Sequence, residues 1–275
     1  MSTVLVTGAS GSLGRQVVRA LLEAGHTCRA LVHRKRLPPP EGSAHPDAAA
    51  HPEGRFEERD GDLLTGAGVE AALQGVDAVI HCATSPSRPT NVDVGGTSRL
   101  LQAMRSAAPS AHVIYISIVG VAEGHDYFYY RAKADAERLI SESTVPWSIL
   151  RATQFYELLV RFLRPSDRLP FAVIPGKLRF QPMAGSEAAR RLVEIVEEGP
   201  VGRAPDIGGP EIRDAVDLAR TYRRHIGRRP RVISLPLAGR GARSFLTERH
   251  ILGEPRYGRQ TWEEYLAERF PTARS

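Results

Sequence analysis

Short apolar runs and longer amphipathic segments follow one another along the first half of the chain. Residues 3–6 form an apolar run that leads into a glycine-rich turn. After the turn, Leu13, Val17 and Leu21 recur at the spacing of one helix face. The strands predicted in this way are residues 3–6, 27–32, 55–59, 77–82, 112–117 and 147–151, and the helices are residues 13–24, 66–73, 97–107 and 129–141.

After Gln154 the pattern loosens into shorter elements. Thr261 and Glu264 have the spacing of a capping box, in which each side chain pairs with the other residue's backbone N–H, and they predict a last helix ending near Phe270. The other elements expected here are strands at residues 179–183 and 232–235, a helix at residues 186–197, and a helix that ends in the basic run 223–231.

Residues 37–54 contain five prolines, three of them consecutive. Proline has no backbone N–H and its ring clashes with the preceding helical turn, so consecutive prolines exclude an ordinary helix at the start of this segment. We expect an irregular loop, with one short helical turn around the alanines at positions 48–50.

Length and composition describe one soluble α/β unit, or a large domain with a smaller lobe: 275 residues, 42% hydrophobic and 25% charged. No apolar run approaches the roughly 20 residues of a membrane helix, and the first strand begins too early to leave room for a signal peptide. Cys28 and Cys82 are too few for a disulfide framework or a metal cluster. We expect both to be reduced core residues of a cytoplasmic protein without a metal.

The net charge of +6 raises the question of nucleic-acid binding. The densest basic run, residues 223–231, closes a predicted helix, where cations interact favourably with the helix dipole. No aromatic residues that could stack on bases are interleaved with these arginines. A solvated basic face is therefore the favoured interpretation, and no nucleic-acid partner is expected.

The glycine-rich turn has the composition of a phosphate-binding loop. Gly8, Gly11 and Gly14 lie between the first strand and the first helix. Glycines let the backbone turn tightly and approach a pyrophosphate, while the helix N-terminus offers free N–H groups. Strand, turn and helix in this order predict a dinucleotide site, with an ordinary tight turn as the alternative.

Basic residues follow the second strand, where NAD-specific proteins usually place a carboxylate for the adenine ribose. Residues 33–36 contain no acid, and Arg34 with Arg15 would suit the 2′-phosphate of NADP. The sequence thus favours NADP(H) over NAD(H), with a solvated basic loop as the alternative.

Lys133 is one of only three lysines among the 37 basic residues of the chain, and Tyr129 precedes it by four positions. On a helix these two side chains share one face. A nearby ammonium lowers the pKa of a phenol and makes proton transfer near neutral pH feasible, whereas a guanidinium is a poor substitute for that compact charge. Tyr127 and Tyr130 compete for the role of proton donor, but helical register favours Tyr129.

Taken together, these motifs resemble the atypical short-chain dehydrogenase/reductases, and within them the NmrA-like, NAD(P)H-binding subgroup. The resemblance covers most of the chain and implies a Rossmann-like, doubly wound parallel sheet. It also implies an NAD(P)-binding domain at residues 1–154 and a smaller C-terminal substrate-binding lobe at residues 155–275, interleaved with the core in one structural unit. Besides the glycines and the Tyr129/Lys133 pair, the matching segments are residues 61–63, 79–84, 92–97, 115–120 and 146–155.

The resemblance implies roles for individual residues. Ser117 would hydrogen-bond a substrate carbonyl oxygen, Tyr129 would donate the proton, and Lys133 would hold the cofactor ribose. The implied cofactor-binding residues are Gly8, Ser10, Gly11, Ser12, Leu13, Gly14, Arg15, Arg34, Asp62, Leu63, Ala83, Thr84, Lys133, Ala152, Thr153 and Phe155. Candidates for an apolar substrate wall, each equally suited to a core, are Phe155, Tyr156, Phe171, Phe180 and Met183.

The activity implied is NADP-dependent hydride transfer to a carbonyl, quinone or enone of a hydrophobic small molecule. The subgroup also includes proteins that bind the dinucleotide as redox sensors without turning it over, and a nucleotide-sugar epimerase or dehydratase is a further alternative. Partners expected are a small-molecule substrate and neither nucleic acid nor membrane, with the chain as a monomer or homodimer.

Overall fold

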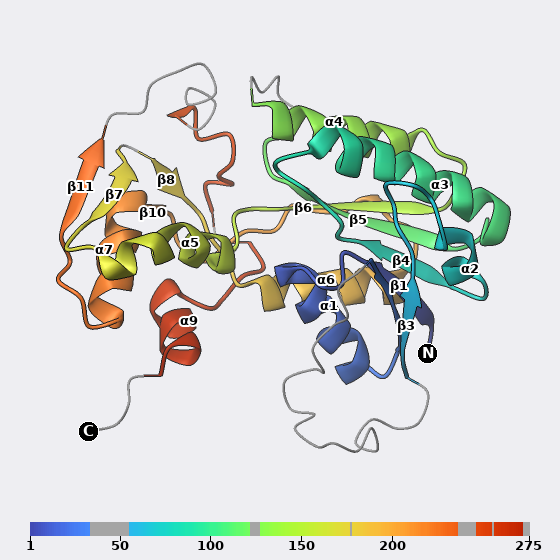
Figure 1. Cartoon of the computed structure of the whole chain (residues 1–275), viewed down its shortest axis with the longest axis horizontal. Helices are drawn as coiled ribbons and strands as arrows, with labels where there is room; N and C mark the ends of the chain where they lie inside the picture. The colour runs from blue at the N-terminus through green and yellow to red at the C-terminus, as the bar shows by residue number, and fades with distance from the viewer. Residues whose placement is uncertain (34–54, 122–126, 177, 236–245, 255, 272–275) are drawn as a thin grey trace. The chain divides into compact units, whose positions relative to one another are not determined.

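Parallel strand pairing organises the first half of the chain. The computed structural model describes residues 1–33, 55–121, 127–176, 178–235, 246–254 and 256–271, and its largest sheet has seven strands in the order β3-β2-β1-β4-β5-β6-β9 (Figure 1). These strands are β1 (Thr3–Thr7), β2 (Thr27–Val32), β3 (Phe56–Asp60), β4 (Ala78–His81), β5 (His112–Ile118), β6 (Trp147–Ala152) and β9 (Gly202–Arg203).

The strand order reverses at β1. The chain runs outward from β1 to β2 and β3, and then returns to place β4 on the other side of β1. The pairs β1–β2, β2–β3, β1–β4 and β4–β5 are all parallel. This is the Rossmann-like, doubly wound arrangement, which confirms the predicted fold class, and ligands of such sheets bind at the strand ends where the order reverses.

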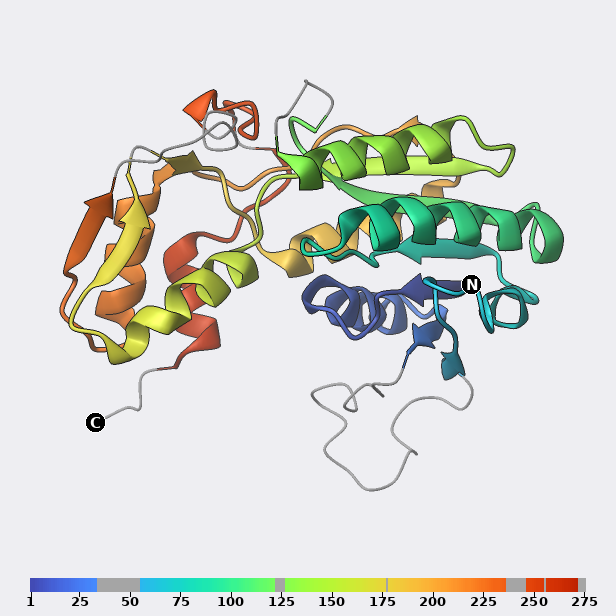
Figure 2. The same cartoon turned by 45° about the horizontal axis from the view of Figure 1, so that its top comes forward.

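Helices cover both faces of this sheet, which explains why β1 and β4 are almost fully buried apolar runs. One face carries α2 (Val69–Leu73), α3 (Gly96–Ala107) and α4 (Phe128–Ser141), and the other carries α1 (Ser12–Glu23) and α6 (Gly185–Glu198) (Figures 1 and 2). The core beneath α2, α3 and α4 includes Leu5, Val79, Leu100, Met104, Val113 and Ile140.

Two compact units divide the chain, and each is assembled from separate segments. The first comprises Met1–Ser117, Phe128–Leu150 and Ala189–Pro205, and the second Ile118–Tyr127, Arg151–Ala188 and Asp206–Ser275. The first unit contains the sheet. A substrate-binding role for residues 155–275 stays a prediction.

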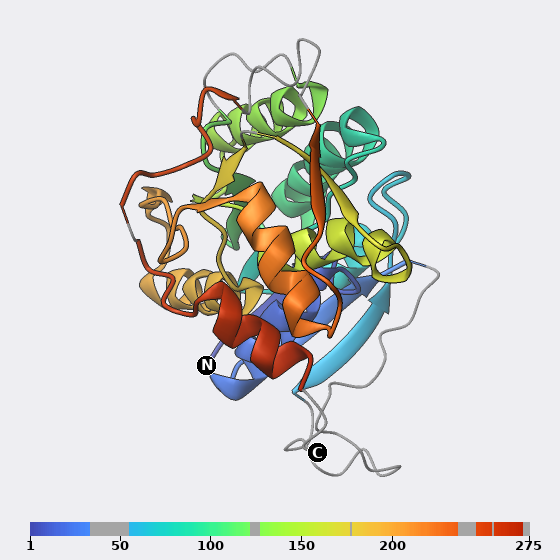
Figure 3. The same cartoon turned by 90° about the vertical axis from the view of Figure 1, so that its left-hand side faces the viewer.

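In the described residues of the second unit, the helices α5 (Tyr156–Leu163), α7 (Ala215–His225) and α9 (Trp262–Arg269) pack around their own apolar core (Figure 3). Two small sheets accompany them, one antiparallel between β8 (Arg179–Phe180) and β10 (Arg213–Asp214), and one parallel between β7 (Ala172–Pro175) and β11 (Val232–Leu235). A one-turn 3-10 helix, Arg164–Arg168, follows α5.

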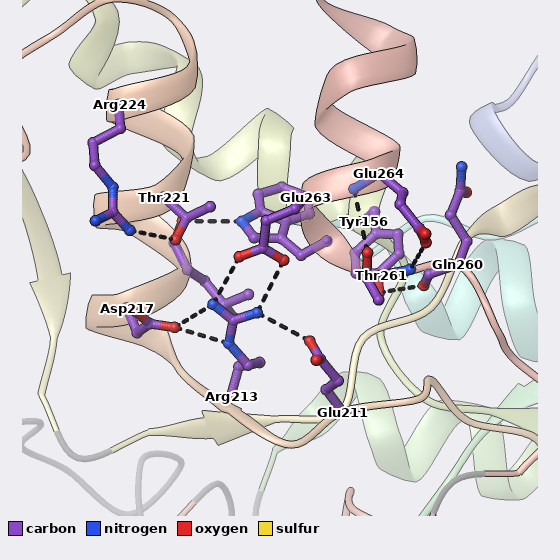
Figure 4. Close-up of polar contacts among 12 residues, drawn as sticks. Tyr156, Glu211, Arg213, Asp217, Thr221, Arg224, Gln260, Thr261, Glu263 and Glu264 are labelled. Carbon is purple, nitrogen blue, oxygen red and sulfur yellow. Dashed lines mark hydrogen bonds and ion pairs between the residues drawn. The ribbon is translucent and has the colours of Figure 1, made fainter.

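Arg213 ties β10 to α7 and α9 in this unit (Figure 4). Its guanidinium contacts Glu263 at 3.1 Å, Asp217 at 2.5 Å and Glu211 at 3.0 Å. The hydrogen bonds that Arg213 donates, first to Glu263 and then to Asp217 and Glu211, raise the pKa of Arg213 above its usual value. A network of this kind fixes geometry more firmly than an isolated surface ion pair does.

Most predicted elements are present with shifted ends. The capping box of Thr261 and Glu264 is confirmed, with both reciprocal bonds formed. The strand predicted at residues 179–183 is wrong beyond Phe180: the Gln181 side chain bonds the backbone of Gly209 and Leu252, and Pro182 has no N–H for a ladder.

Other predictions need smaller corrections. The helix expected from residue 66 begins at Val69, because Gly66 and Gly68 have φ values of 84° and 74° that a right-handed helix excludes. Helix α5 and strand β7 were not predicted. The proline-rich segment 37–54 lies outside the described residues. Within the described part of the chain, no helix combines the length and apolarity needed to cross a bilayer.

Candidate active site

The glycine-rich turn is built for close backbone approach. Gly8 has φ +67°, and a Cβ there would lie 2.7 Å from the backbone nitrogen of Ala83. A Cβ on Gly14 would overlap the Gly8 carbonyl oxygen, so this position also excludes a side chain. The turn is closed by a 2.9 Å bond from Gly11 N–H to Gly8 C=O. These constraints account for Gly at both ends of the turn.

The start of α1 fits an anionic ligand. Gly11 is the N-cap, no side chain caps the first turn, and that turn contains no acidic residue. Ser10, Gly11 and Ser12 are exposed and Leu13 is half-buried. The unpaired N–H groups and the dipole at such a helix start favour a phosphate. The residues present therefore fit the pyrophosphate of a dinucleotide.

Groups expected at the adenosine end gather where β2 and β3 end. His33 Nδ1 lies 3.8 Å from Asp62 Oδ2, and Asp62 Oδ1 accepts a 2.9 Å bond from Leu64 N–H. Leu63 is buried in the core. Arg15 is exposed and donates to the Ser10 carbonyl at 3.0 Å. Arg34 lies outside the described residues, so its predicted contact with a 2′-phosphate stays a prediction.

His81 connects the end of β1 to α3 through a hydrogen-bonded chain. Its Nδ1 lies 2.6 Å from Thr7 Oγ1, and its Nε2 lies 3.0 Å from Thr97 Oγ1. Thr97 donates its one hydroxyl proton to the Asp93 carbonyl oxygen, so Nε2 of His81 must donate to Thr97. Nδ1 then accepts from Thr7, whose oxygen also accepts from Ala83 N–H at 3.3 Å.

This series of hydrogen bonds through His81 requires a neutral imidazole. Burial, together with the positive charge of Lys133, lowers the pKa of His81 from 6.5 to about 3. The ring therefore acts as a structural link between the glycine-rich turn and α3.

Tyr129 and Lys133 lie one turn apart on α4, as the sequence predicted. The Tyr129 hydroxyl lies 2.9 Å from Thr84 Oγ1, at the end of β4. Tyr130, a competitor in the sequence, is buried with its ring edge-on to that of Tyr129. The structure thus brings Tyr129, Lys133 and Thr84 together.

Lys133 is 3% exposed, and its ammonium is held on several sides. Nζ donates to the Ile116 carbonyl oxygen at 2.8 Å and lies 3.8 Å from Asp93 Oδ1. Burial lowers the pKa of Lys133, and the negative charges of Asp93 and Glu137 oppose that shift. This environment suits a compact ammonium and explains Lys in a chain that otherwise uses Arg.

Asp93 is a site residue that the sequence analysis did not single out. It lies in a π-helical turn, Thr90–Gly95, directly before α3, and π turns often occur at functional sites. Its carboxylate is fully buried, with Oδ1 accepting from Thr84 Oγ1 at 2.6 Å and Oδ2 from Ser85 N–H at 3.1 Å. The available signal was an acid inside the segment 92–97, at a helix start otherwise without charge.

Ser117 follows Ile116 at the end of β5 and is 3% exposed. Its hydroxyl oxygen has no hydrogen-bond partner among the described residues. Leaving a buried hydroxyl unpaired costs about 1–3 kcal/mol, and such a group in a native structure calls for a bound partner such as water or a ligand. Ser117 is thus available for a ligand oxygen, although its catalytic role stays a prediction.

The remaining predicted residues belong to the second unit. The backbones of Phe155 and Met183 pair in an isolated parallel β-bridge, and the Thr153 hydroxyl donates to the Gln181 carbonyl oxygen at 2.5 Å. Tyr156 is 1% exposed, packs on Trp262 and donates to Gln260 C=O, so its side chain serves the core. Ala152 is buried, and Phe171 and Phe180 are half-buried. Their predicted cofactor and substrate roles stay predictions.

The family model described as NAD(P)H-binding matches residues 8–157, more than half of the chain. The chain belongs to this NAD(P)H-binding family, and its doubly wound parallel sheet with a glycine-rich turn after the first strand is the arrangement of dinucleotide-binding folds.

Sequence relatives include both reductases and assembly factors. A (4-alkanoyl-5-oxo-2,5-dihydrofuran-3-yl)methyl phosphate reductase of Streptomyces griseus is 28% identical over 82% of this chain and 74% of its own. The divinyl chlorophyllide a 8-vinyl-reductase of Oryza sativa is 29% identical over 86% of this chain and 62% of its own. The photosystem II assembly factor Ycf39 of Cyanophora paradoxa is 31% identical over 58% of this chain, which spans 47% of that relative.

Solved structures share the fold. The NADPH-dependent quinone oxidoreductase QOR2 of Escherichia coli has a TM-score of 0.72 at 16% identity, covering 97% of this chain and 99% of its own. UDP-glucose 4-epimerase of Bifidobacterium longum has a TM-score of 0.73 at 14% identity, covering 97% and 96%. At these identities the likeness establishes the architecture and leaves the chemistry open.

Proposed function

We propose that this protein is an NADP-dependent oxidoreductase that reduces a carbonyl, quinone or enone of a hydrophobic small molecule. The observation that carries the proposal is the Tyr129/Lys133 pair on α4, with the ammonium buried beneath the helix and the phenol partly exposed. A buried Lys one helical turn from a partly exposed phenol is costly to maintain, and proton-transfer chemistry would account for its presence. The two named reductase relatives support the direction of reaction.

Each residue has a defined task in this mechanism. The bound nicotinamide would supply the hydride that adds to the substrate carbon. Tyr129 gives its phenolic proton to the substrate oxygen, and Lys133 stabilises the phenolate left behind. Ser117, whose buried hydroxyl lacks a partner in the described chain, donates to the same substrate oxygen as negative charge develops on it.

The glycine-rich turn and the start of α1 would hold the pyrophosphate, and the basic residues after β2 would favour NADP. The preference for NADP is supported by the charges of Arg15 and Arg34 and by the NADPH dependence of the structural neighbour QOR2. Cofactor preference is therefore a part of the proposal that direct binding measurements must test.

A second candidate function is a dinucleotide-binding sensor or scaffold without turnover. The observation in its favour is the sequence similarity to proteins named as photosystem II assembly factors. An epimerase function has only structural neighbours in its favour, at identities that show the fold alone.

The deciding experiment follows NADPH absorbance when purified protein meets a panel of quinones, aromatic ketones and enones, with the Tyr129→Phe variant run beside it. Turnover that depends on Tyr129 is the expected result. Tight NADPH binding without turnover on every compound would favour the sensor, and equal turnover in the variant would remove Tyr129 from the mechanism.

A further inference from the structure

A buried carboxylate stands behind the proposed acid, one hydroxyl away. Thr84 Oγ1 donates to Asp93 Oδ1 at 2.6 Å, and the same oxygen of Thr84 lies 2.9 Å from the Tyr129 hydroxyl. A threonine hydroxyl has one proton and two lone pairs. Since an ionised carboxylate only accepts, the Thr84 proton is committed to Asp93, and Thr84 must accept from Tyr129.

The direction of the hydrogen bonds from Tyr129 to Thr84 and from Thr84 to Asp93 matters for the ionisation of Tyr129. A phenolate at this position would face a lone pair of Thr84 in place of a donor, with the negative charge of Asp93 behind it. Hydrogen bonding to the neutral form and a nearby like charge both raise the pKa of an acid. The arrangement therefore favours the phenol over the phenolate.

The other titratable groups near these hydrogen bonds do not reverse the preference for the neutral phenol of Tyr129. Lys133 supplies one positive charge, and Glu137 on the same helix supplies a negative charge in addition to that of Asp93. Tyr115 on β5, with a pKa raised by burial, is neutral, as are His81 and Cys82 at the end of β4. Among these described groups, the positive charge of Lys133 is thus opposed by the negative charges of Asp93 and Glu137.

We propose that Asp93 is a positioning residue which, through the Thr84 hydroxyl, keeps Tyr129 protonated and so extends proton donation to higher pH. The consequence for catalysis rests on the proposed reductase function, whereas the effect on Tyr129 ionisation does not. During reduction Tyr129 loses its proton to the substrate oxygen as hydride reaches the carbon, and the partly exposed phenolate regains a proton from water. Lys133 makes that loss possible, and Asp93 sets the upper end of the pH range in which the phenol starts protonated.

The Asp93→Asn variant tests the direction of the two hydrogen bonds that link Tyr129, Thr84 and Asp93. The carboxamide keeps the shape but has one acceptor and one NH₂ donor. With its oxygen on Ser85 N–H, the NH₂ group donates to Thr84, whose proton is then free to bond the Tyr129 oxygen. We expect the Tyr129 phenol to titrate lower by about one pH unit or more.

The readout is ultraviolet absorbance of tyrosinate in the cofactor-free protein. The chain has eight tyrosines, so the curve of the same protein carrying Tyr129→Phe is subtracted from each curve, which leaves the titration of Tyr129. This measurement needs neither substrate nor turnover. A shift in Asp93→Asn without turnover on any substrate would leave this inference standing and the reductase proposal failed. An unchanged Tyr129 titration would overturn the inference.

Variants at Thr84 separate the hydroxyl route from simple charge repulsion. Thr84 is exposed, so Thr84→Val should fold even if Asp93→Asn does not. In a double-mutant cycle, the effect of Asp93→Asn should fall to less than about half in the Thr84→Val background, because the link is absent. Thr84→Ser keeps the hydroxyl and should titrate as the wild type does. If Asp93→Asn shifted the Tyr129 titration as much in the Thr84→Val background as in the wild type, the effect would not pass through the Thr84 hydroxyl.

The pH profile gives the catalytic reading. For an active substrate, the alkaline limb of kcat/KM for reduction should move to lower pH in Asp93→Asn and stay in place in Thr84→Ser. A purely structural role for Asp93 would lower activity equally at every pH, and that outcome would contradict the proposal.

Discussion

The ammonium of Lys133 lies 4.1 Å from the centre of the Tyr115 ring, over its face. A desolvated cation–π contact contributes about 2 kcal/mol, which offsets part of the cost of burying the charge. With the bond to Ile116 C=O, strand β5 holds the charge from both its backbone and a side chain. The position is therefore shaped for an ammonium.

Lys133→Arg should be damaging even though it keeps the charge. The larger guanidinium does not fit between the Tyr115 ring and Asp93, and overpacking of this kind costs about 1–3 kcal/mol. We expect a lower urea midpoint and a loss of turnover of about 100-fold or more. Arg131→Lys, on an exposed position of the same helix, is the matched control and should change neither quantity. Wild-type stability and turnover in Lys133→Arg would show that no compact cation is needed.

Tyr129→Phe should abolish turnover and leave the Kd for NADPH within about threefold of wild type. Only the hydroxyl is removed, and its proposed role lies in chemistry. Cofactor fluorescence titration and steady-state kinetics measure the two effects separately. Tyr130→Phe is the control, because Tyr130 is a buried neighbour without a proposed catalytic role. Loss of cofactor binding in Tyr129→Phe would point to a positional role for the phenol.

Arg34→Ala and Arg15→Ala should weaken NADPH by about 10-fold or more and leave NADH almost unchanged. Only NADPH carries the 2′-phosphate that a guanidinium would bind. Calorimetric titration of both cofactors against each variant gives the comparison. Equal losses for NADPH and NADH would assign the basic cluster another task.

Gly14→Ala should prevent dinucleotide binding and reduce stability, because the added methyl overlaps the Gly8 carbonyl oxygen. Gly11→Ala is the milder variant for comparison. Its Cβ would lie 3.0 Å from the same oxygen, a tight contact that a small movement of the backbone can relieve. NADPH binding and thermal unfolding should rank wild type above Gly11→Ala and Gly11→Ala above Gly14→Ala. Full binding by Gly14→Ala would show that the turn can open.

His81 should make the protein sensitive to acid. Because its pKa falls from 6.5 to about 3 in the folded state, the unfolded chain binds more protons between these values. The stability contributed by neutral His81 is complete above about pH 6.5 and is lost as the pH falls toward 3. The stability gap between wild type and His81→Gln should therefore narrow by about 2 kcal/mol between pH 8 and pH 5. Urea unfolding at both pH values measures it, and a constant gap would contradict the neutral assignment.

Local signals in the sequence were enough for strands β1 to β6 of the large sheet and for placing Tyr129 and Lys133 on one helix, whereas the two-residue strand β9 was not predicted. Apolar runs located the strands, and helical register selected Tyr129 over Tyr130. Helix α5 was not predicted, because it is short and only Glu157 and Arg161 mark its polar face, with the exposed apolar side chains of Leu158 and Phe162 directly after them.

Asp93 could not be identified from the sequence because its role depends on a contact nine residues away. Thr84 and Asp93 meet only after a loop returns the chain from the end of β4 to a π-helical turn. The spacing of apolar residues gives no signal for a π-helical turn, and the sequence predicted an ordinary helix starting at residue 97. The fold is thus encoded by repeated local patterns, whereas the environment of Tyr129 is created by tertiary contacts.

The burial of Lys133 also gives the protein an internal chemical probe. With 3% of its surface exposed, this amine is out of reach of acylating reagents while α4 lies on the sheet. Its rate of modification would therefore measure how often the helix lifts from the sheet, in the same way that amide exchange measures local opening. A bound dinucleotide that contacts α4 would slow this labelling, so cofactor affinity can be followed by mass spectrometry without any substrate.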